Sequence, residues 1–339
     1  MQGIVRLAPG LAVVAAITAV ATALGALVPV VGGPVFGIVL GAVCATVLRP
    51  GSRVAAGAGF AGKRVLQASI VVLGTGLSLT QVVQVGVASL PVMLGTLAVA
   101  LLGAAVVGRL LRVDGDVRTL IGVGTGICGA SAIAATTAVI GAAEAEVAYA
   151  IGTIFTFNVA AVLLYPTLGH LLGLSQHAFG LWAGTAINDT SSVVAAAYTY
   201  GPDAGAYGVV VKLTRTLMII PISIALAALA AHRERAARTT EVDAAARRTI
   251  PWRRLFPLFI VGFLAASALD TAGAIPASWH PTLGTIGVLL ITAALTGIGL
   301  STRLATLRAA GHRPLLLGGV LWLLVGATSL LLQAATGTL

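Results

Sequence analysis

Long apolar stretches separated by short polar segments make up most of this 339-residue sequence. A helix that crosses a bilayer needs about 20 predominantly apolar residues. The apolar stretches cover residues 9–30, 34–48, 65–85, 90–108, 119–140, 147–169, 178–198, 206–231, 255–270, 282–301 and 314–336. The pattern predicts an all-α membrane protein with about eleven transmembrane helices. We expect residues 1–339 to form a single polytopic domain, in which the long polar stretch 231–254 is a helical cytoplasmic linker.

The composition excludes a soluble globular protein. Only 9% of the residues are charged and 58% are hydrophobic, whereas about a quarter of an ordinary soluble domain is charged. The net charge of +10 would indicate nucleic acid in a soluble protein, but cytoplasmic loops of a membrane protein explain it better. We therefore expect a lipid bilayer as partner and no nucleic acid. Cys44 and Cys128 both lie in apolar stretches, so we expect no disulfide framework, no metal and no cofactor.

The distribution of Lys and Arg predicts the orientation of the chain. With the N-terminus inside, the inner segments hold 18 of the 20 basic residues; these segments are Arg6 and the loops 49–64, 109–118, 170–177, 232–254 and 302–313. The opposite loops hold none and carry the acidic residues Glu144, Glu146, Asp203 and Asp270. Because cytoplasmic loops are enriched in Lys and Arg, the sequence predicts an N-in, C-out topology.

A pair of similar short segments bears on the expected architecture. GTGLSL at 74–79 resembles GIGLST at 297–302, and the two helices that carry them run in opposite directions in the expected topology. Transporters often contain inverted repeats of this kind. Six positions in a chain with 42 glycines also match by chance, so an inverted repeat and a chance match both remain open.

Three charged residues lie at membrane depth: Asp189, Lys212 and Arg215. An intramembrane charge costs about 2.5–3.5 kcal/mol on insertion scales, and such residues usually mark a pathway or a ligand site. Lys212 and Arg215 are three residues apart and share a helix face. Arg215 keeps its charge and needs a carboxylate or a substrate oxyanion as partner. We expect Asp189 to be that carboxylate, and a snorkelling Lys212 is the alternative to a ligand role.

The fifth apolar stretch contains GTGICGAS at its centre, residues 124–131. Each glycine weakens a helix by about 1 kcal/mol relative to alanine, so we expect the helix to break near Gly126. A break exposes backbone N–H groups and the positive end of a half-helix, which together favour an anion. A glycine-rich packing face is the alternative interpretation.

The seventh apolar stretch carries five consecutive polar residues, 188–192, with Asp189 among them. A lipid-facing helix cannot carry this cluster, so it must face protein, water or ligand, and we expect a second break near Asp189. Asn158 lies near the centre of the sixth stretch, where interhelical contact and ligand contact are equal alternatives.

Long motifs resemble a known family. GTGICGASAIAA, EVAYAIGTIFTFNVAAVLLYPTLGHLLGLSQ, WAGTAINDTSSVVAAA and VVVKLTRTLMIIPI are similar to segments of the YeiH-type sulfate exporter family of bacterial inner-membrane proteins. The resemblance extends from about Gly33 to Trp322. It implies a multi-pass transporter-like fold in the bacterial inner membrane and sulfate as the substrate, and it brings no established catalytic residues.

We therefore expect a membrane transporter, not an enzyme, that exports a small inorganic or sulfonate-type anion by alternating access. H⁺ or Na⁺ is the expected coupling ion, and the sequence is compatible with a homo-oligomer. Two alternatives remain open: a cation-coupled importer of an organic anion and an intramembrane lipid-modifying enzyme. The residues expected to bind substrate are Arg215, Lys212, Asp189, Asn188, Thr190, Ser191, Ser192, Thr125, Gly126, Cys128, Gly129, Ser131 and Asn158.

Overall fold

The computed structural model describes residues 2–28, 32–48, 51–237, 258–301 and 312–339, and within these ranges the chain is helical and contains no strand. Residues 238–254 of the expected linker lie outside the described residues, as do residues 302–311 of the last basic loop. Residues 231–237 continue a helix, α12, which ends at Ala237.

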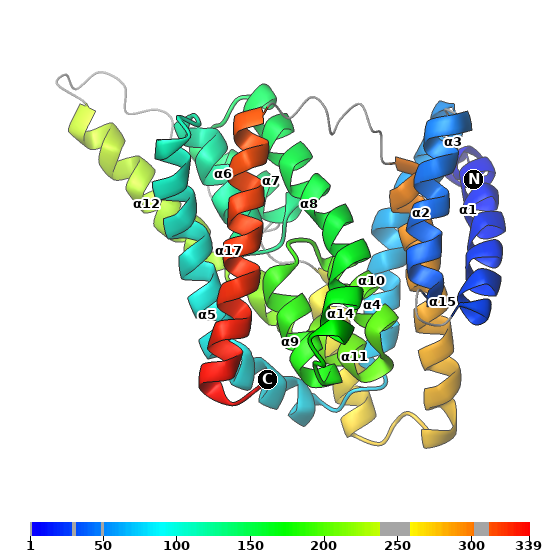
Figure 1. Ribbon diagram of the computed structural model, residues 1–339. Coiled ribbons are helices and arrows are strands. Elements are labelled where there is room, and N and C mark those ends of the chain that lie inside the picture. The colour runs from blue at the N-terminus through cyan, green and yellow to red at the C-terminus, as the bar shows by residue number, and fades with distance from the viewer. Residues whose placement is uncertain (1, 29–31, 49–50, 238–257, 302–311) are drawn as a thin grey trace.

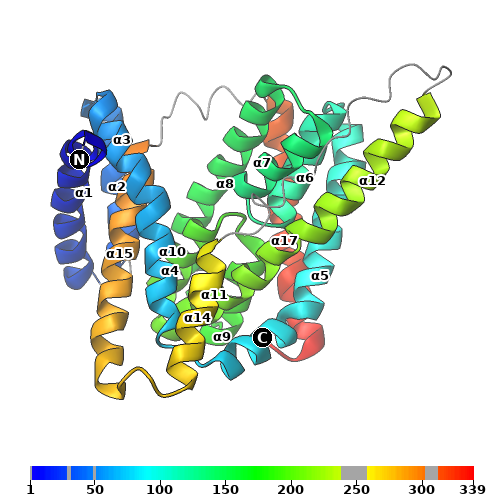
Figure 2. The ribbon, with the colours of Figure 1, turned by 180° about the vertical axis from the view of Figure 1, so that it is seen from behind.

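The helices form two bundles that pack side by side (Figures 1 and 2). The first bundle contains α1 (Gln2–Leu27), α2 (Gly32–Leu48), α3 (Ser52–Phe60), the π-helical turn η1 (Ala61–Val65), α4 (Leu66–Gly74), α14 (Leu258–Thr271), the short 3-10 turn η2 (Ala277–Trp279) and α15 (His280–Ser301). The second contains α5 (Leu79–Leu110), α6 (Gly115–Gly126), α7 (Ala130–Ile140), α8 (Glu144–Leu171), α9 (Gln176–Ala186), α10 (Thr190–Tyr200), α11 (Pro202–Leu217), α12 (Ile219–Ala237) and α17 (His312–Thr336).

Six helices of the described chain are long and apolar enough to cross a membrane, judged by length and composition. They are Leu7–Leu27, Leu79–Leu110, Glu144–Leu171, Pro202–Leu226, Ala277–Ser301 and His312–Thr336, and Gly32–Val47 and Leu258–Thr271 are shorter apolar helices. Large apolar side chains point outward from these helices, with Leu110 77% and Leu102 66% exposed. An apolar outer surface is what a lipid environment requires, so the fold confirms the expected multi-pass helical class.

Small residues set the helix spacing within the first bundle. A Cβ atom on Gly41 of α2 would lie 2.5 Å from the carbonyl oxygen of Thr296 on α15, and one on Gly299 would lie 2.3 Å from that of Ile38. Gly10 of α1 and Gly57 of α3 approach each other in the same way. Helices in lipid associate through close backbone contact because no hydrophobic force drives them together.

The third apolar stretch ends earlier than predicted. α4 stops at Gly74, a turn follows, and α5 begins at Leu79, so residues 79–85 belong to the next helix. Ser78 caps α5: its hydroxyl accepts the N–H of Gln81, whose side chain accepts the N–H of Ser78. This capping box defines the start of a helix. Hydropathy alone missed it because the turn, Thr75–Ser78, is too short to lower the average over a whole apolar stretch.

The fifth apolar stretch is a re-entrant hairpin and not a crossing helix. α6 ends at Gly126 and α7 begins at Ala130, which confirms the predicted break. Gly124 of α6 faces Ile133 of α7, and Ile140 at the far end of α7 packs against the cluster that contains Val117 of α6. The outer ends of both half-helices therefore lie at the same end of the protein, the upper end in Figure 1.

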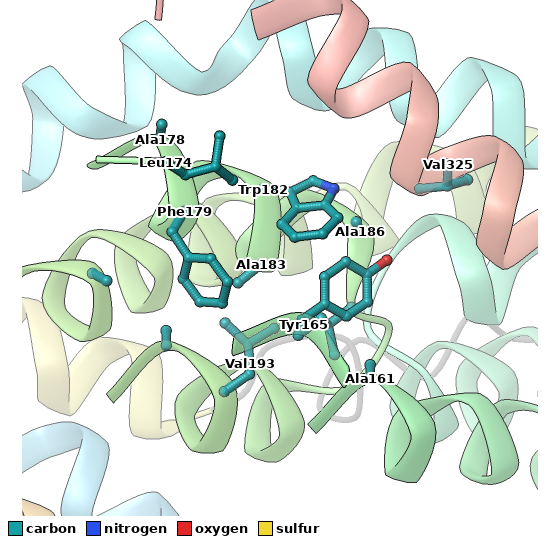
Figure 3. Close-up of a cluster of buried hydrophobic side chains, with 14 of the residues drawn as sticks. Ala161, Tyr165, Leu174, Ala178, Phe179, Trp182, Ala183, Ala186, Val193 and Val325 are labelled. Atoms are coloured by element: carbon teal, nitrogen blue, oxygen red, sulfur yellow. The ribbon is translucent and has the colours of Figure 1, made fainter. Parts of the chain in front are cut away.

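The seventh apolar stretch forms a second hairpin, which enters from the opposite end. α9 ends at Ala186 and α10 begins at Thr190, as the predicted break near Asp189 requires. The ring of Tyr200 at the end of α10 stacks on Phe179 of α9, with ring centroids 3.9 Å apart. The Gln176 side chain, at the start of α9, accepts the N–H of Asp203 just beyond α10. Figure 3 shows the apolar core of this hairpin.

The prediction of eleven crossing helices is therefore wrong. Two of the eleven stretches enter the protein and return, and α8 between them runs in the opposite sense to the one expected. The helices before the first hairpin and after the second keep their expected directions, because two crossings have been replaced by two re-entrant segments. The N- and C-terminal ends lie at opposite ends of the protein, as predicted (Figure 1).

Candidate functional site

The two hairpins meet inside the second bundle. We call the non-helical residues Ile127–Gly129 the first tip and Ile187–Asp189 the second tip. Gly129 has φ +65°, and a Cβ atom there would lie 3.4 Å from the Cβ atom of Asp189. The first tip thus rests directly on the second, and four half-helix ends converge at one place.

Lys212 joins the two tips from α11. Its side chain is fully buried, and Nζ donates hydrogen bonds to the carbonyl oxygen of Ile127 at 2.7 Å and to that of Ile187 at 2.9 Å. The first of these carbonyls ends α6 and the second ends α9. Lys212 does not snorkel to the surface, which was the alternative for this residue.

Arg215 lies one helical turn further along α11 and caps the same end of α6. It is 0% exposed; Nε donates to the carbonyl oxygen of Gly126 at 2.6 Å and Nη2 to that of Thr125 at 2.9 Å. The last carbonyls of a helix lack intrahelical partners and carry the negative end of the macrodipole. Both cations therefore stabilise the C-terminal ends of the half-helices.

The expected ion pair between Asp189 and Arg215 is not formed. Among the described residues no salt bridge within 4.0 Å joins Asp189 to Arg215 or to Lys212. The Asp189 carboxylate instead caps α10, where it accepts the Ser191 N–H at 3.0 Å and the Ser191 hydroxyl. The positive end of α10 stabilises a carboxylate, and the carbonyls at the ends of α6 and α9 already supply partial negative charge to the cations.

Asn158 of α8 fixes the second tip. Its Oδ1 accepts the backbone N–H of Asp189 at 3.1 Å, and the side chain is 4% exposed. Asn158 therefore makes an interhelical contact, one of the two roles expected for it. It also lines the pocket described next, so the second role stays open.

A pocket of about 300 Å³ lies where the two bundles face each other. The first turns of α7 and α10 form part of its wall, so the N-terminal ends of both inner half-helices open onto it. Its remaining wall is mostly apolar. The lining residues are Gly62, Lys63, Leu66, Gln67, Ile70, Ala130, Ser131, Ile151, Ile154, Phe155, Asn158, Asp189, Thr190, Ser191, Phe259 and Ile298.

The structure divides the thirteen residues expected to bind substrate into two groups. Five line the pocket: Ser131, Asn158, Asp189, Thr190 and Ser191. The other eight do not: Lys212 and Arg215 bind the tip carbonyls, Thr125 and Gly126 supply carbonyls to Arg215, and Cys128, Gly129, Asn188 and Ser192 pack in and around the tips. Cys128, for example, is 2% exposed and belongs to an apolar cluster. Only the side of the tips that carries the helix N-termini reaches the pocket.

Sequence reasoning missed the contribution of the first bundle. Lys63 and Gln67 line the pocket from η1 and from α4. Lys63 was read as one of the loop charges that set orientation. The π-helical turn that carries it is a feature found disproportionately at functional sites, and the sequence gives no sign of that turn.

Three buried polar atoms around the tips have no hydrogen-bond partner within the described part of the chain: Thr125 Oγ1, Asn188 Oδ1 and Arg215 Nη1. An unsatisfied buried group costs about 1–3 kcal/mol. The contact between the tips therefore contains unfavourable terms.

Long apolar helices around two re-entrant hairpins, with a pocket beside the tips of the hairpins, define a multi-pass membrane protein with an interior site. The chain matches the family model "Conserved hypothetical protein 698" over residues 9–318. It is 42% identical over 342 residues to a "UPF0324 membrane protein" of Streptococcus pyogenes serotype M3, covering 98% of each chain. It is 39% identical to a protein of that name from Fusobacterium nucleatum over 334 residues, covering 93% of this chain and 94% of the relative. The chain belongs to this family, the YeiH-type family of bacterial membrane proteins.

Proposed function

We propose that this protein is a membrane transporter that exports a small inorganic or sulfonate-type anion, with sulfate as the first candidate. One observation carries the proposal: the N-terminal ends of α7 and α10 open onto one interior pocket, while Lys212 and Arg215 occupy the opposite half-helix ends. Half-helix N-termini that point at an interior site are a recurrent way to bind anionic groups in transporters.

The electrostatics of the pocket favour an anion. Each helix N-terminus carries the equivalent of about half a positive charge, and two converge here. Lys212 and Arg215 bind the carbonyls at the C-terminal ends of α6 and α9 and neutralise their partial negative charge, which would otherwise repel an anion in the pocket. Asp189 is the sole carboxylate among the described residues that line the pocket, and its charge offsets the N-terminus of α10. The N-terminus of α7 and the ammonium of Lys63 are therefore the positive groups left for an anion.

Hydrogen-bond donors at the pocket match an oxyanion. The backbone N–H groups of Ala130 and Ser131 in α7 and of Thr190 in α10 have no partners within their own helices, whereas the N–H of Ser191 is already bound by Asp189. The hydroxyls of Ser131 and Thr190 lie beside them. The oxygen of Asn158 is taken by Asp189, so its amide can serve the pocket as a donor. In this proposal these groups hold the anion, and Lys212 and Arg215 hold the tips and do not touch it.

The position of the pocket supports a mechanism of alternating access. It is bounded by α7, α8 and α10 on one side and by η1, α4, α14 and α15 on the other, so movement of one bundle against the other changes its access. The two hairpins enter from opposite ends, and each is followed by a membrane-crossing helix, α8 or α11 with α12. This is the relation that an inverted repeat requires.

The positive-inside rule supports an N-in, C-out orientation. Arg53 lies in the first turn of α3, Arg109 in the last turn of α5 and Arg112 in the turn before α6. These helix ends lie at the same end of the protein as the N-terminus (Figure 1). In this orientation residues 141–143 are cytoplasmic and residues 172–175 are external, the reverse of the topology with eleven crossings. The pocket also includes Lys63, which follows α3 at the cytoplasmic end.

Asp189 is the group through which a cation gradient would act, because it is a carboxylate at the wall of the anion pocket. Binding of H⁺ or Na⁺ to this carboxylate would reduce its repulsion of the anion and so couple transport of the cation to transport of the anion. A cation-coupled importer of an organic anion would use the same groups, and the direction of net flux under an imposed gradient separates the two functions.

The proposal is tested by exchange of radiolabelled sulfate into proteoliposomes that contain purified protein and unlabelled sulfate. Thr190→Val keeps the shape of the side chain and removes its hydroxyl, and Thr119→Val makes the same change on a half-buried residue of α6 that does not line the pocket. A neutral hydrogen bond is worth about 0.5–1.5 kcal/mol, so we expect Thr190→Val to raise KM roughly 2- to 10-fold and Thr119→Val to leave it unchanged. Absence of exchange by the unaltered protein with sulfate and with small sulfonates would contradict the proposal.

A further inference from the structure

The two walls of the pocket differ in chemistry. The wall from the second bundle carries the helix N-termini, the hydroxyls and Asp189, whereas the wall from the first bundle is apolar apart from Lys63 and Gln67. Within the described chain, Lys63 is the single basic residue that lines the pocket. The positive charge of the pocket is therefore divided between bundles, with the helix dipoles on one side and an ammonium on the other.

Local packing places Lys63 where it can reach the pocket. A Cβ atom on Gly62 would lie 2.9 Å from the Ile298 side chain, so η1 is held tightly against α15. Lys63 itself is exposed, and its Nζ is not committed to a carboxylate within the described residues. A lysine ammonium is a compact, hydrated charge on a flexible stem, suited to meeting an ion and releasing it.

We propose that Lys63 is the second half of the anion site, so that a bound anion bridges the first bundle to the N-termini of α7 and α10. The inference rests on the proposed function and adds a substrate class to it: oxyanions with two negative charges, which meet Lys63 on one side and the N-terminal end of α7 on the other, while Asp189 offsets the end of α10. A monovalent sulfonate such as methanesulfonate satisfies the helix ends and leaves Lys63 less well matched. Binding of a divalent oxyanion also draws the bundles together, because its ligands come from both.

Arg64 provides a matched control. It is the next residue in the same π-helical turn, carries the same charge and is also exposed, but it does not line the pocket and instead directs Nη1 toward Gln67 Oε1 at 3.4 Å. Loss of either charge changes the surface potential at the cytoplasmic end by the same amount. A difference between Lys63→Gln and Arg64→Gln therefore reports contact with the anion and not general attraction.

The experiment measures KM and maximal rate for sulfate and for methanesulfonate exchange in proteoliposomes of the unaltered protein, Lys63→Gln, Lys63→Arg and Arg64→Gln. A hydrogen bond to a charged group is worth about 1.5–3 kcal/mol, so Lys63→Gln should raise the sulfate KM roughly 10- to 100-fold. Methanesulfonate should be affected less, Lys63→Arg should restore most of the sulfate affinity, and Arg64→Gln should behave like the unaltered protein. Equal sulfate KM values for Lys63→Gln and Arg64→Gln, with the unaltered protein active, would overturn the role of Lys63 and leave the proposed function standing. Inactivity of the unaltered protein would instead count against the proposed function.

Discussion

Gly129 and Asp189 are in contact, although they belong to hairpins that enter the protein from opposite ends. The chain makes this contact with Gly129 at φ +65°, a conformation that favours glycine, and a Cβ atom there would lie in van der Waals contact with Asp189, 3.4 Å from its Cβ and 3.5 Å from its Cα. Every feature of the candidate site depends on this meeting of the tips.

Gly129→Ala should therefore reduce anion flux strongly. Gly129 has φ +65° and ψ −130°, a sparsely populated backbone conformation that costs a non-glycine residue about 1–3 kcal/mol, so alanine would shift the first tip away from its contact with Asp189. Gly173→Ala is the matched control, because Gly173 also has φ +65° and nothing lies within 4 Å of its added Cβ. Both variants should unfold at lower temperature, and only Gly129→Ala should lose flux. Similar flux in the two variants would show that the contact between the tips is not needed.

Arg215→Lys should destabilise the protein although the charge is kept. The guanidinium reaches two successive carbonyls, of Thr125 and Gly126, through different nitrogens, and a lysine ammonium cannot reproduce that fork. The loss of one buried hydrogen bond to a charged group predicts a fall in unfolding free energy of about 1.5–3 kcal/mol, visible as a lower thermal midpoint in detergent. The sulfate KM of the folded fraction should change little. A large rise in the sulfate KM at unchanged stability would instead indicate that Arg215 binds the substrate.

Asp189→Asn should separate coupling from folding. Asparagine caps a helix as well as aspartate does, so α10 and the second tip should remain intact. If Asp189 carries the coupling cation, sulfate transport by the variant should no longer respond to an imposed H⁺ or Na⁺ gradient, while exchange at equal sulfate concentrations continues. A gradient response equal to that of the unaltered protein would exclude Asp189 from coupling.

Cysteine accessibility tests the re-entrant topology directly. In a variant with Cys44 and Cys128 replaced by alanine, Ala143→Cys should react with impermeant thiol reagents from the cytoplasmic side and Leu172→Cys from the external side. Both positions are exposed at the ends of α8. Eleven crossing helices would reverse the two results. Labelling in inside-out and right-side-out vesicles distinguishes the topologies without reference to transport.

Much of the fold could be predicted from the sequence because bilayer burial leaves a strong hydropathy signal. The helix breaks near Gly126 and Asp189 were also predictable, since glycines and consecutive polar residues interrupt those stretches. Re-entrance was not, because a hairpin and a crossing have the same composition. The orientation of α8 was hidden for a related reason: the segments at its two ends, 141–143 and 172–175, contain no Lys or Arg for the positive-inside rule to use.

The candidate site was predicted in part. The burial of Lys212 and Arg215 could be predicted from their positions in an apolar stretch. Their partners could not be predicted, because they bind backbone carbonyls that are free only at the end of a half-helix, and the sequence does not show which half-helix ends lie beside α11. The role of Lys63 could not be predicted from the sequence either. It lies among loop charges in the sequence, and only the packing of η1 against α15 places it beside the pocket.

The most direct test of the central claim is a structure of the protein with selenate, a heavier analogue of sulfate whose selenium can be located by anomalous scattering. The account predicts selenium in the pocket between the bundles, next to Ser131 and Thr190 at the N-terminal ends of α7 and α10. Selenium bound against Lys212 and Arg215, with the tip carbonyls displaced, would contradict it.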